Sequence, residues 1–176
     1  GENGIGKSTL LKTITGIIPP LQGEVNLLNK SLQSYKPLDL AQELSIVLTE
    51  KLPPSNLTVY EIIALGRQPY TNWLGTLSEE DKTKIEEAIA LTEIQHLVHK
   101  KHDEISDGQL QIALIARALA QDTSIIILDE PTNNLDIQNI EILTAAINEY
   151  KGTLIVVSHD VHFLEEIHIQ DFIELY

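Results

Sequence analysis

A glycine-rich stretch at the start of the chain, Gly1–Thr9, matches the pattern G-x-x-x-x-G-K-[ST] and constrains the fold more than any other feature. Glycines let the backbone curl so that successive N–H groups point at phosphate oxygens, and a following helix directs its positive end at the same oxygens. Lys7 would reach the β- and γ-phosphates of a nucleotide, and the Ser8 hydroxyl would bind Mg²⁺. The alternative is a glycine-rich turn before an ordinary helix. The residues predicted to contact the nucleotide here are Gly1, Glu2, Asn3, Gly4, Ile5, Gly6, Lys7, Ser8 and Thr9.

Size and composition indicate a single folded domain. The 176 residues are enough to bury a core, and 43% of them are hydrophobic. A net charge of −14 argues against a nucleic-acid surface, and the lack of cysteine excludes disulfides and thiolate metal sites. Because a phosphate loop normally follows a buried strand, we expect this chain to be part of a longer protein that extends beyond Gly1.

The first two thirds of the chain alternate between helix and strand signals and then become helical. A helix is expected over Lys7–Ile17, short strands over Glu24–Leu28 and Ser45–Leu48, and a loop over Pro53–Asn56. Three capping boxes, in which a Ser or Thr and a residue three positions later cap a helix start, are predicted to open later helices. These boxes are Thr58–Glu61, Ser78–Asp81 and Ser106–Gln109, with helices running to about Arg67, Thr92 and Gln121, and a short helix over Ile94–His99 between them. Ile85, Ala88, Ile89 and Leu91 are the expected apolar side of the second helix.

The last third of the chain has the pattern of a parallel sheet. Continuous apolar runs at Ile125–Asp129 and Thr153–Ser158 are typical of strands buried on both faces. Helices are expected over Ile140–Tyr150 and Val161–Ile167, with a final strand over Phe172–Tyr176. Alternating strands and helices predict an α/β fold with right-handed crossovers.

Two acidic residues follow the strand at Ile125–Asp129. Asp129, at the carboxyl end of a buried parallel strand, would lie at the sheet edge where α/β proteins bind ligands, and it can hold Mg²⁺ through water. Glu130 points differently and can polarise a water that attacks the γ-phosphate. A surface acidic turn is the alternative interpretation.

These motifs resemble those of ATP-binding cassette (ABC) ATPases, in the family's order and over essentially the whole chain. Gly1–Ser8 resembles the Walker A motif, Ile125–Glu130 the Walker B motif and Ile105–Gln109 the signature sequence Leu-Ser-Gly-Gly-Gln. Asn134–Asp136 resembles the D-loop, and Ser158–Asp160 resembles the switch-histidine segment. The resemblance implies a P-loop NTPase fold, with a mostly parallel sheet core formed by residues 1–58 and 108–176 and a helical subdomain inserted at 59–107.

The resemblance also implies a head-to-tail dimer that binds ATP and Mg²⁺ between its subunits. Ser8 and Asp129 would bind the metal, and Glu130 and His159 would be catalytic. Contacts to the ATP of the partner subunit would come from Ser106, Gly108, Gln109 and Asp136. From the residues alone, Ser106 could equally be a plain helix cap and His159 a structural histidine.

This sequence departs from the family pattern at several positions. Asp107 occupies a signature position where glycine is usual, and adds a carboxylate near a phosphate site. The family's Q-loop glutamine, which touches Mg²⁺ and couples the site to the transmembrane partner, is replaced by Thr49 with Glu50 next to it. Either Glu50 substitutes or the coupling differs. The aromatic residue that stacks on adenine in the family would precede this chain.

The sequence resembles two subfamilies. Leu57–Gly75 is similar to the ATP-binding subunits of iron–siderophore and cobalamin importers, which work with a transmembrane permease at the cytoplasmic side of the membrane. Asn134–Leu164 is similar to ABC-F proteins, which bind the ribosome, but those carry two cassettes and a basic linker. We favour the importer and expect no direct nucleic-acid contact. A degraded or chimeric cassette that does not hydrolyse ATP is the third possibility.

Overall fold

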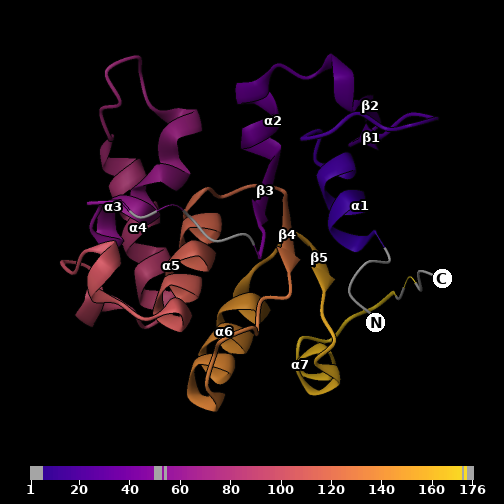
Figure 1. Ribbon diagram of the computed structural model, residues 1–176. Helices are drawn as coiled ribbons and strands as arrows, with labels where there is room; N and C mark the ends of the chain where they lie inside the picture. The colour runs from indigo at the N-terminus through magenta and orange to yellow at the C-terminus, as the bar shows by residue number, and fades with distance from the viewer. Residues whose placement is uncertain (1–5, 50–52, 54, 172, 174–176) are drawn as a thin grey trace.

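A three-stranded parallel sheet stands at the centre of the computed structural model, which describes residues 6–49, 53, 55–171 and 173 (Figure 1). Its strands are β3 (Leu44–Val47), β4 (Ile125–Asp129) and β5 (Thr153–Val157), in the order β3-β4-β5. Val47 pairs with Leu128, and Asp129 pairs with Val157. The carboxyl ends of the three strands therefore meet at one edge of the sheet, as the predicted parallel arrangement requires.

Helices cover both faces of this sheet, with α3, α4 and α5 gathered on one side of the molecule and α1 on the other (Figure 1). The described helices are α1 (Lys7–Ile14), α2 (Pro37–Glu43), α3 (Val59–Ala64), α4 (Glu79–Leu91), α5 (Asp107–Ala120), α6 (Ile137–Glu149) and α7 (Val161–Glu166). Short 3₁₀ turns are η1 (Leu32–Ser34), η2 (Leu65–Tyr70), η3 (Gln95–Leu97) and η4 (His102–Glu104). A small antiparallel hairpin joins β1 (Asn26–Leu27) to β2 (Lys30–Ser31). Within the described part of the chain, no helix is long and apolar enough to cross a membrane.

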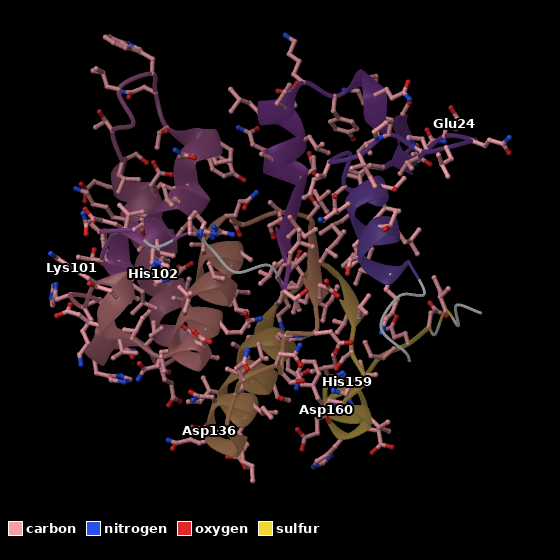
Figure 2. The ribbon with its side chains drawn as sticks, viewed as in Figure 1. Glu24, Lys101, His102, Asp136, His159 and Asp160 are labelled. Carbon is pink, nitrogen blue, oxygen red and sulfur yellow. The ribbon has the colours of Figure 1, made fainter. Side chains whose placement is uncertain are left out.

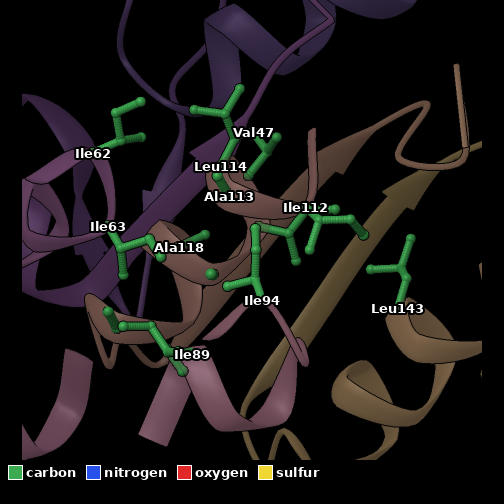
Figure 3. Packing of buried hydrophobic residues seen from close by; sticks show 14 of the residues in the cluster. Val47, Ile62, Ile63, Ile89, Ile94, Ile112, Ala113, Leu114, Ala118 and Leu143 are labelled. Carbon is green, nitrogen blue, oxygen red and sulfur yellow. The ribbon is translucent and has the colours of Figure 1, made fainter. Parts of the chain in front are cut away.

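Strand β4 is apolar on both faces because each face meets its own cluster. Ile126 and Leu128 belong to the main core, which also contains residues of α3 to α7. Figure 3 shows part of this core, and its labelled side chains include Ile63 of α3, Ile89 of α4 and Leu143 of α6. Ile127 points the other way and packs with Leu11 of α1 and Leu44 of β3. The period of two along a strand explains this alternation, and two-sided burial explains the unbroken apolar run.

The predicted helix starts are confirmed by their caps. Hydrogen bonds in both directions form the capping boxes at Thr58–Glu61, Ser78–Asp81 and Ser106–Gln109. Helix α6 begins three residues before the predicted start at Ile140, because the Asp136 side chain accepts a hydrogen bond from the backbone N–H of Asn139. A carboxylate at an N-cap position satisfies an otherwise unpaired donor of the first turn.

Several predicted ends and contacts are wrong. Helix α1 ends at Ile14 rather than Ile17, because Gly16 adopts a left-handed conformation with φ of +76°. Leu91 is 39% exposed and does not belong to the buried side of α4. Only one 3₁₀ turn, η3, forms within the helix predicted over Ile94–His99.

Other differences concern strands and one unpredicted helix. Strand β5 is only partly buried, whereas a fully buried strand was predicted. The strand predicted over Glu24–Leu28 shrinks to β1 and pairs with β2 across a turn in which Leu28 and Asn29 have positive φ. Helix α2 was not predicted. The final strand predicted over Phe172–Tyr176 lies outside the described residues, apart from residue 173.

Candidate nucleotide-binding site

Side chains from α1, β3 and β4 meet at the carboxyl edge of the sheet. Asp129 ends β4 and is buried, with 3% of its surface exposed. Ser8, in the first turn of α1, donates a hydrogen bond from Oγ to Asp129 Oδ2 at 3.4 Å. Thr49, just beyond β3, donates from Oγ1 to the same oxygen at 3.2 Å. The edge therefore gathers two hydroxyls and one carboxylate, and these include both predicted metal-binding residues.

Glu130 lies between a lysine and a histidine at the same edge. The Lys7 Nζ atom is 3.5 Å from Glu130 Oε1, and His159 Nδ1 is 2.7 Å from Glu130 Oε2. The backbone N–H of His159 donates to Oε2 as well, at 3.2 Å. The Glu130 side chain is 15% exposed and that of His159 is 62% exposed, so the pair faces solvent through the histidine. The two residues predicted to be catalytic are thus in direct contact with each other, and Glu130 also contacts Lys7.

The backbone of Glu130 is held in an uncommon conformation. Its φ is +47°, in the left-handed region that non-glycine residues rarely occupy. Its N–H donates to the carbonyl of Val157 at 2.7 Å, which continues the ladder between β4 and β5 for one residue. Strain of this kind costs about 1–3 kcal/mol and gathers at functional sites, so it favours a functional role for the Glu130 carboxylate.

The described part of the glycine-rich stretch forms the start of α1. Gly6 is the N-cap residue with φ of +85°, and its carbonyl accepts the first helical hydrogen bond from Leu10. This places Lys7 and Ser8 in the first helical turn, where N–H groups favour an anion. Thr9 is exposed in the same turn. The predicted contacts Gly1–Ile5 lie outside the described residues, as does Glu50.

The signature segment forms the N-terminal end of α5. Ser106 Oγ accepts a hydrogen bond from the N–H of Gln109, and the N–H of Ser106 donates to the Gln109 side chain. Because a hydroxyl can accept and donate at once, this cap does not use the O–H donor of Ser106. Asp107 is exposed in the first turn, where a negative charge suits the helix dipole.

Gly108 explains why the signature needs a glycine. A Cβ atom at this position would lie 2.5 Å from the carbonyl oxygen of Asn134, closer than real Cβ contacts come. The D-loop, in which Asn134 has a φ of +63°, therefore packs directly on the backbone of α5 in the same subunit. Nothing in the local sequence predicted this contact, although the glycine itself was a signal.

The remaining predicted residues do not join the Ser8–Asp129 group in the described part of the chain. Asp136 caps α6, and Figure 2 shows it apart from His159. Ser106, Gly108 and Gln109 belong to the α5 end. An arrangement of two separate surfaces is what the predicted head-to-tail dimer would require, since each site then needs residues from two copies.

The oxygens at Asp129 suit magnesium. Mg²⁺ in nucleotide sites is bound by one or two protein oxygens together with phosphates and waters, and hydroxyl and carboxylate oxygens are its preferred ligands. The described residues include no group of three or more His, Cys, Asp and Glu side chains that could hold a metal by themselves. The chemistry of the Ser8 hydroxyl and the Asp129 carboxylate fits Mg²⁺ when a nucleotide and waters supply its other ligands.

The sheet, the helix start and the acidic strand end define a P-loop nucleotide-binding domain. The model of the ABC transporter family matches residues 1–133, and the chain belongs to that family.

Two curated relatives and one solved structure match almost the whole chain. An ABC transporter ATP-binding protein of Methanocaldococcus jannaschii, itself uncharacterized, is 44% identical over 92% of this chain and 57% of its own length. The ferric enterobactin transport ATP-binding protein FepC of Escherichia coli is 37% identical over 92% of this chain and 61% of its own. The chain thus spans about three fifths of these curated relatives. A dimeric ATP-binding cassette, MJ0796, solved in a post-hydrolysis state with ADP and Pi, superposes with a TM-score of 0.77 at 30% identity, covering 94% of this chain and 75% of that one.

Proposed function

We propose that this chain is part of the ATP-binding and ATP-hydrolysing subunit of an ABC importer for an iron–siderophore or a similar metal chelate. The observation that carries the proposal is the contact of Glu130 with both Lys7 and His159, next to the Ser8–Asp129 pair. These are the groups that hydrolysis of a nucleoside triphosphate requires: a phosphate-binding cation, a metal site and a base. The relative that transports ferric enterobactin supports the choice of substrate class.

In the proposed mechanism, Lys7 leaves Glu130 and binds the β- and γ-phosphates of ATP. Mg²⁺, held by Ser8 and Asp129, would neutralise charge on the phosphate oxygens. Glu130, freed from Lys7, accepts a proton from a water whose oxygen attacks the γ-phosphorus, while the bond from phosphorus to the ADP oxygen breaks. His159 keeps the Glu130 carboxylate oriented through the 2.7 Å contact.

A second copy of the cassette completes each proposed site. Ser106, Gly108 and Gln109 of one copy would meet the γ-phosphate bound by the other through the exposed helix N-terminus. Asp136 would lie at the same interface. We further propose that residues 59–107 form a helical subdomain that meets a transmembrane permease, with 1–58 and 108–176 as the ATPase core. The subunit would then sit at the cytoplasmic face of the membrane without entering it.

The two alternatives have less support. A ribosome-bound ABC-F protein is disfavoured because a transport ATP-binding protein matches 92% of this chain. The acidic net charge of −14 points the same way. A cassette that has lost hydrolysis is disfavoured by the contacts of Glu130, because Lys7, Glu130 and His159 are all present and adjacent.

The test uses the full-length protein carrying Glu130→Gln, which removes the base but keeps the shape. With ATP present it should remain closed as a dimer and fractionate with membranes together with a permease, while its turnover falls by about 10²–10⁴-fold. Lys7→Ala is the matched control, because it should lose nucleotide binding and so fail to dimerise with ATP. Migration with ribosomes would overturn the importer, and normal turnover in Lys7→Ala would overturn the ATPase.

A further inference from the structure

Thr49 occupies an unexpected place at the edge of the sheet. Strands β3 and β4 are parallel neighbours, and Val47 pairs with Leu128. Thr49 follows Val47 by two residues, so it leaves the sheet next to Asp129 and Glu130. Its hydroxyl points at the carboxylate of Asp129 and donates to Oδ2 at 3.2 Å. A residue that replaces the family's glutamine therefore has a defined partner of its own.

The same carboxylate oxygen receives a second hydroxyl. Ser8 Oγ, in the first turn of α1, donates to Asp129 Oδ2 at 3.4 Å and is 121 residues away in sequence. A single hydrogen bond leaves a carboxylate able to rotate about its last bond, whereas two donors from different elements restrict that rotation. Asp129 itself is buried, whereas Ser8 and Thr49 are exposed, so the two hydroxyls hold the carboxylate at the border between the protein interior and solvent.

We propose that Thr49 is a positioning residue for the magnesium of bound Mg·ATP, acting through Asp129. The inference rests on the proposed function, because it assumes that Ser8 and Asp129 hold the metal. Groups that hydrogen-bond to a metal-binding carboxylate set its orientation and contribute to metal affinity. Thr49 suits this task because its β-branched side chain has few rotamers and therefore presents its hydroxyl in a fixed direction.

The positions of the two hydroxyls indicate different roles for Ser8 and Thr49. The Ser8 hydroxyl belongs to the phosphate-binding helix and would serve the metal directly. The Thr49 hydroxyl comes from the sheet edge and has Asp129 as its partner. Thr49 therefore keeps the carboxylate oriented whether or not nucleotide has engaged α1, which prepares the acidic half of the metal site before ATP arrives.

The experiment measures metal affinity rather than turnover. The full-length protein is loaded with a non-hydrolysable ATP analogue and titrated with Mn²⁺, and free Mn²⁺ is followed by electron paramagnetic resonance. Thr49→Val keeps the side-chain shape but removes the hydroxyl, and it should weaken Mn²⁺ binding about tenfold. Thr49→Ser restores a hydroxyl and should bind Mn²⁺ nearly as well as the wild type. Binding of the analogue in EDTA should be the same in all of them.

Thr144→Val is the matched control. It makes the same chemical change at a buried threonine whose hydroxyl donates to the carbonyl of Ile140 within α6, away from the sheet edge. It should leave Mn²⁺ affinity unchanged.

The possible failures are distinguishable. Wild-type affinity in Thr49→Val, or an equal loss in Thr144→Val, would overturn the inference while the proposed function stands. A loss in Thr49→Val that Thr49→Ser does not restore would also overturn it, because the hydroxyl would not be responsible. Failure of the wild-type protein to bind any ATP analogue would overturn the inference and the proposed function together.

Discussion

The two ends of helix α5 are secured in different ways. At the C-terminal end, Arg67 of η2 donates from Nη1 to the carbonyl of Ala120 at 3.0 Å and from Nε to Asp81 of α4 at 2.8 Å. Both charged side chains are buried, at 3% exposure. At the N-terminal end the cap is local, because Ser106 and Gln109 satisfy each other and remain on the surface.

Each end also depends on a glycine, but against a different neighbour. A Cβ at Gly66 would lie 2.3 Å from the carbonyl oxygen of Arg117, and one at Gly108 would lie 2.5 Å from that of Asn134. The contact at Gly66 joins α5 to η2, and the contact at Gly108 joins α5 to the D-loop segment, Asn134–Asp136. The comparison teaches that α5 is anchored by a buried ion pair at one end and closed by a local cap at the surface at the other.

Breaking the buried pair should have the largest effect. Arg67→Met keeps much of the side-chain volume but leaves Asp81 buried without its cation. Removing one partner of a buried ion pair typically costs about 3–5 kcal/mol. The free energy of unfolding of the full-length protein, measured by chemical denaturation, should fall by that amount. A loss below about 1 kcal/mol, the usual value of a surface pair, would contradict the anchoring role.

The pH dependence of stability is a second test of the ion pair between Arg67 and Asp81. Burial raises the pKa of Asp81, but hydrogen bonds from Ser78 and Arg67 and the charge of Arg67 outweigh it and leave the pKa below its ordinary value. A lowered pKa stabilises the fold above about pH 4, the unfolded value, and this contribution is lost as the pH falls through the lower folded pKa. Asp81→Asn should therefore show a smaller loss of stability than the wild type on acidification below about pH 4.

The two glycines should separate stability from activity. Alanine at either position must displace a backbone carbonyl, and overpacking of this kind costs about 1–3 kcal/mol. Gly66→Ala should lower the unfolding free energy while turnover per folded molecule stays close to that of the wild type. Gly108→Ala should lower turnover as well, because it displaces the end of α5 that is proposed to meet ATP. Equal turnover in the two variants would contradict the expectation that only the N-terminal end of α5 takes part in ATP hydrolysis.

The smallest expected effect on stability is that of the exposed cap. Ser106→Ala should cost about 1 kcal/mol, the usual value of an N-cap hydroxyl. Thr58→Ala is the matched variant, since Thr58 caps α3 through the same pair of hydrogen bonds with Glu61. The two should be destabilised alike, but only Ser106→Ala should weaken ATP-dependent dimerisation of the full-length protein, measured by light scattering. Equal dimerisation would mean that Ser106 is a cap and nothing more.

The features that depend on residues close together in sequence were predicted better than the contacts between distant residues. The capping boxes located the starts of α3, α4 and α5, because the two partners of each cap are only three residues apart. The apolar run located β4, because burial on both faces leaves a continuous pattern in the sequence. Helix α2 was missed although Pro37 at its first position and Asp39 in its first turn are start signals. Its lack of buried residues explains the weak periodicity.

The candidate site likewise contains residues that the sequence predicted and contacts that it did not. Glu130 and His159 were both predicted to be catalytic from the family resemblance, and the structure places the two side chains in contact. The ion pair of Lys7 with Glu130 and the hydrogen bond from Thr49 to Asp129 were not expected. The first depends on the packing of α1 against β4, and the second on the register of β3 and β4. These elements are far apart in sequence, so no local pattern records either contact. The role of each site residue remains a prediction until the variants are measured.

Helix α5 is a long element that is held by a buried side chain at one of its two ends, so a small change in its angle moves the other end furthest. Its 14 residues span about 21 Å, and a tilt of about 10° around the clamped end would displace the other end by about 4 Å. That displacement exceeds the length of a hydrogen bond, about 3 Å. A tilt of α5 about the end that Arg67 holds would therefore be large enough to make or break a contact at Ser106.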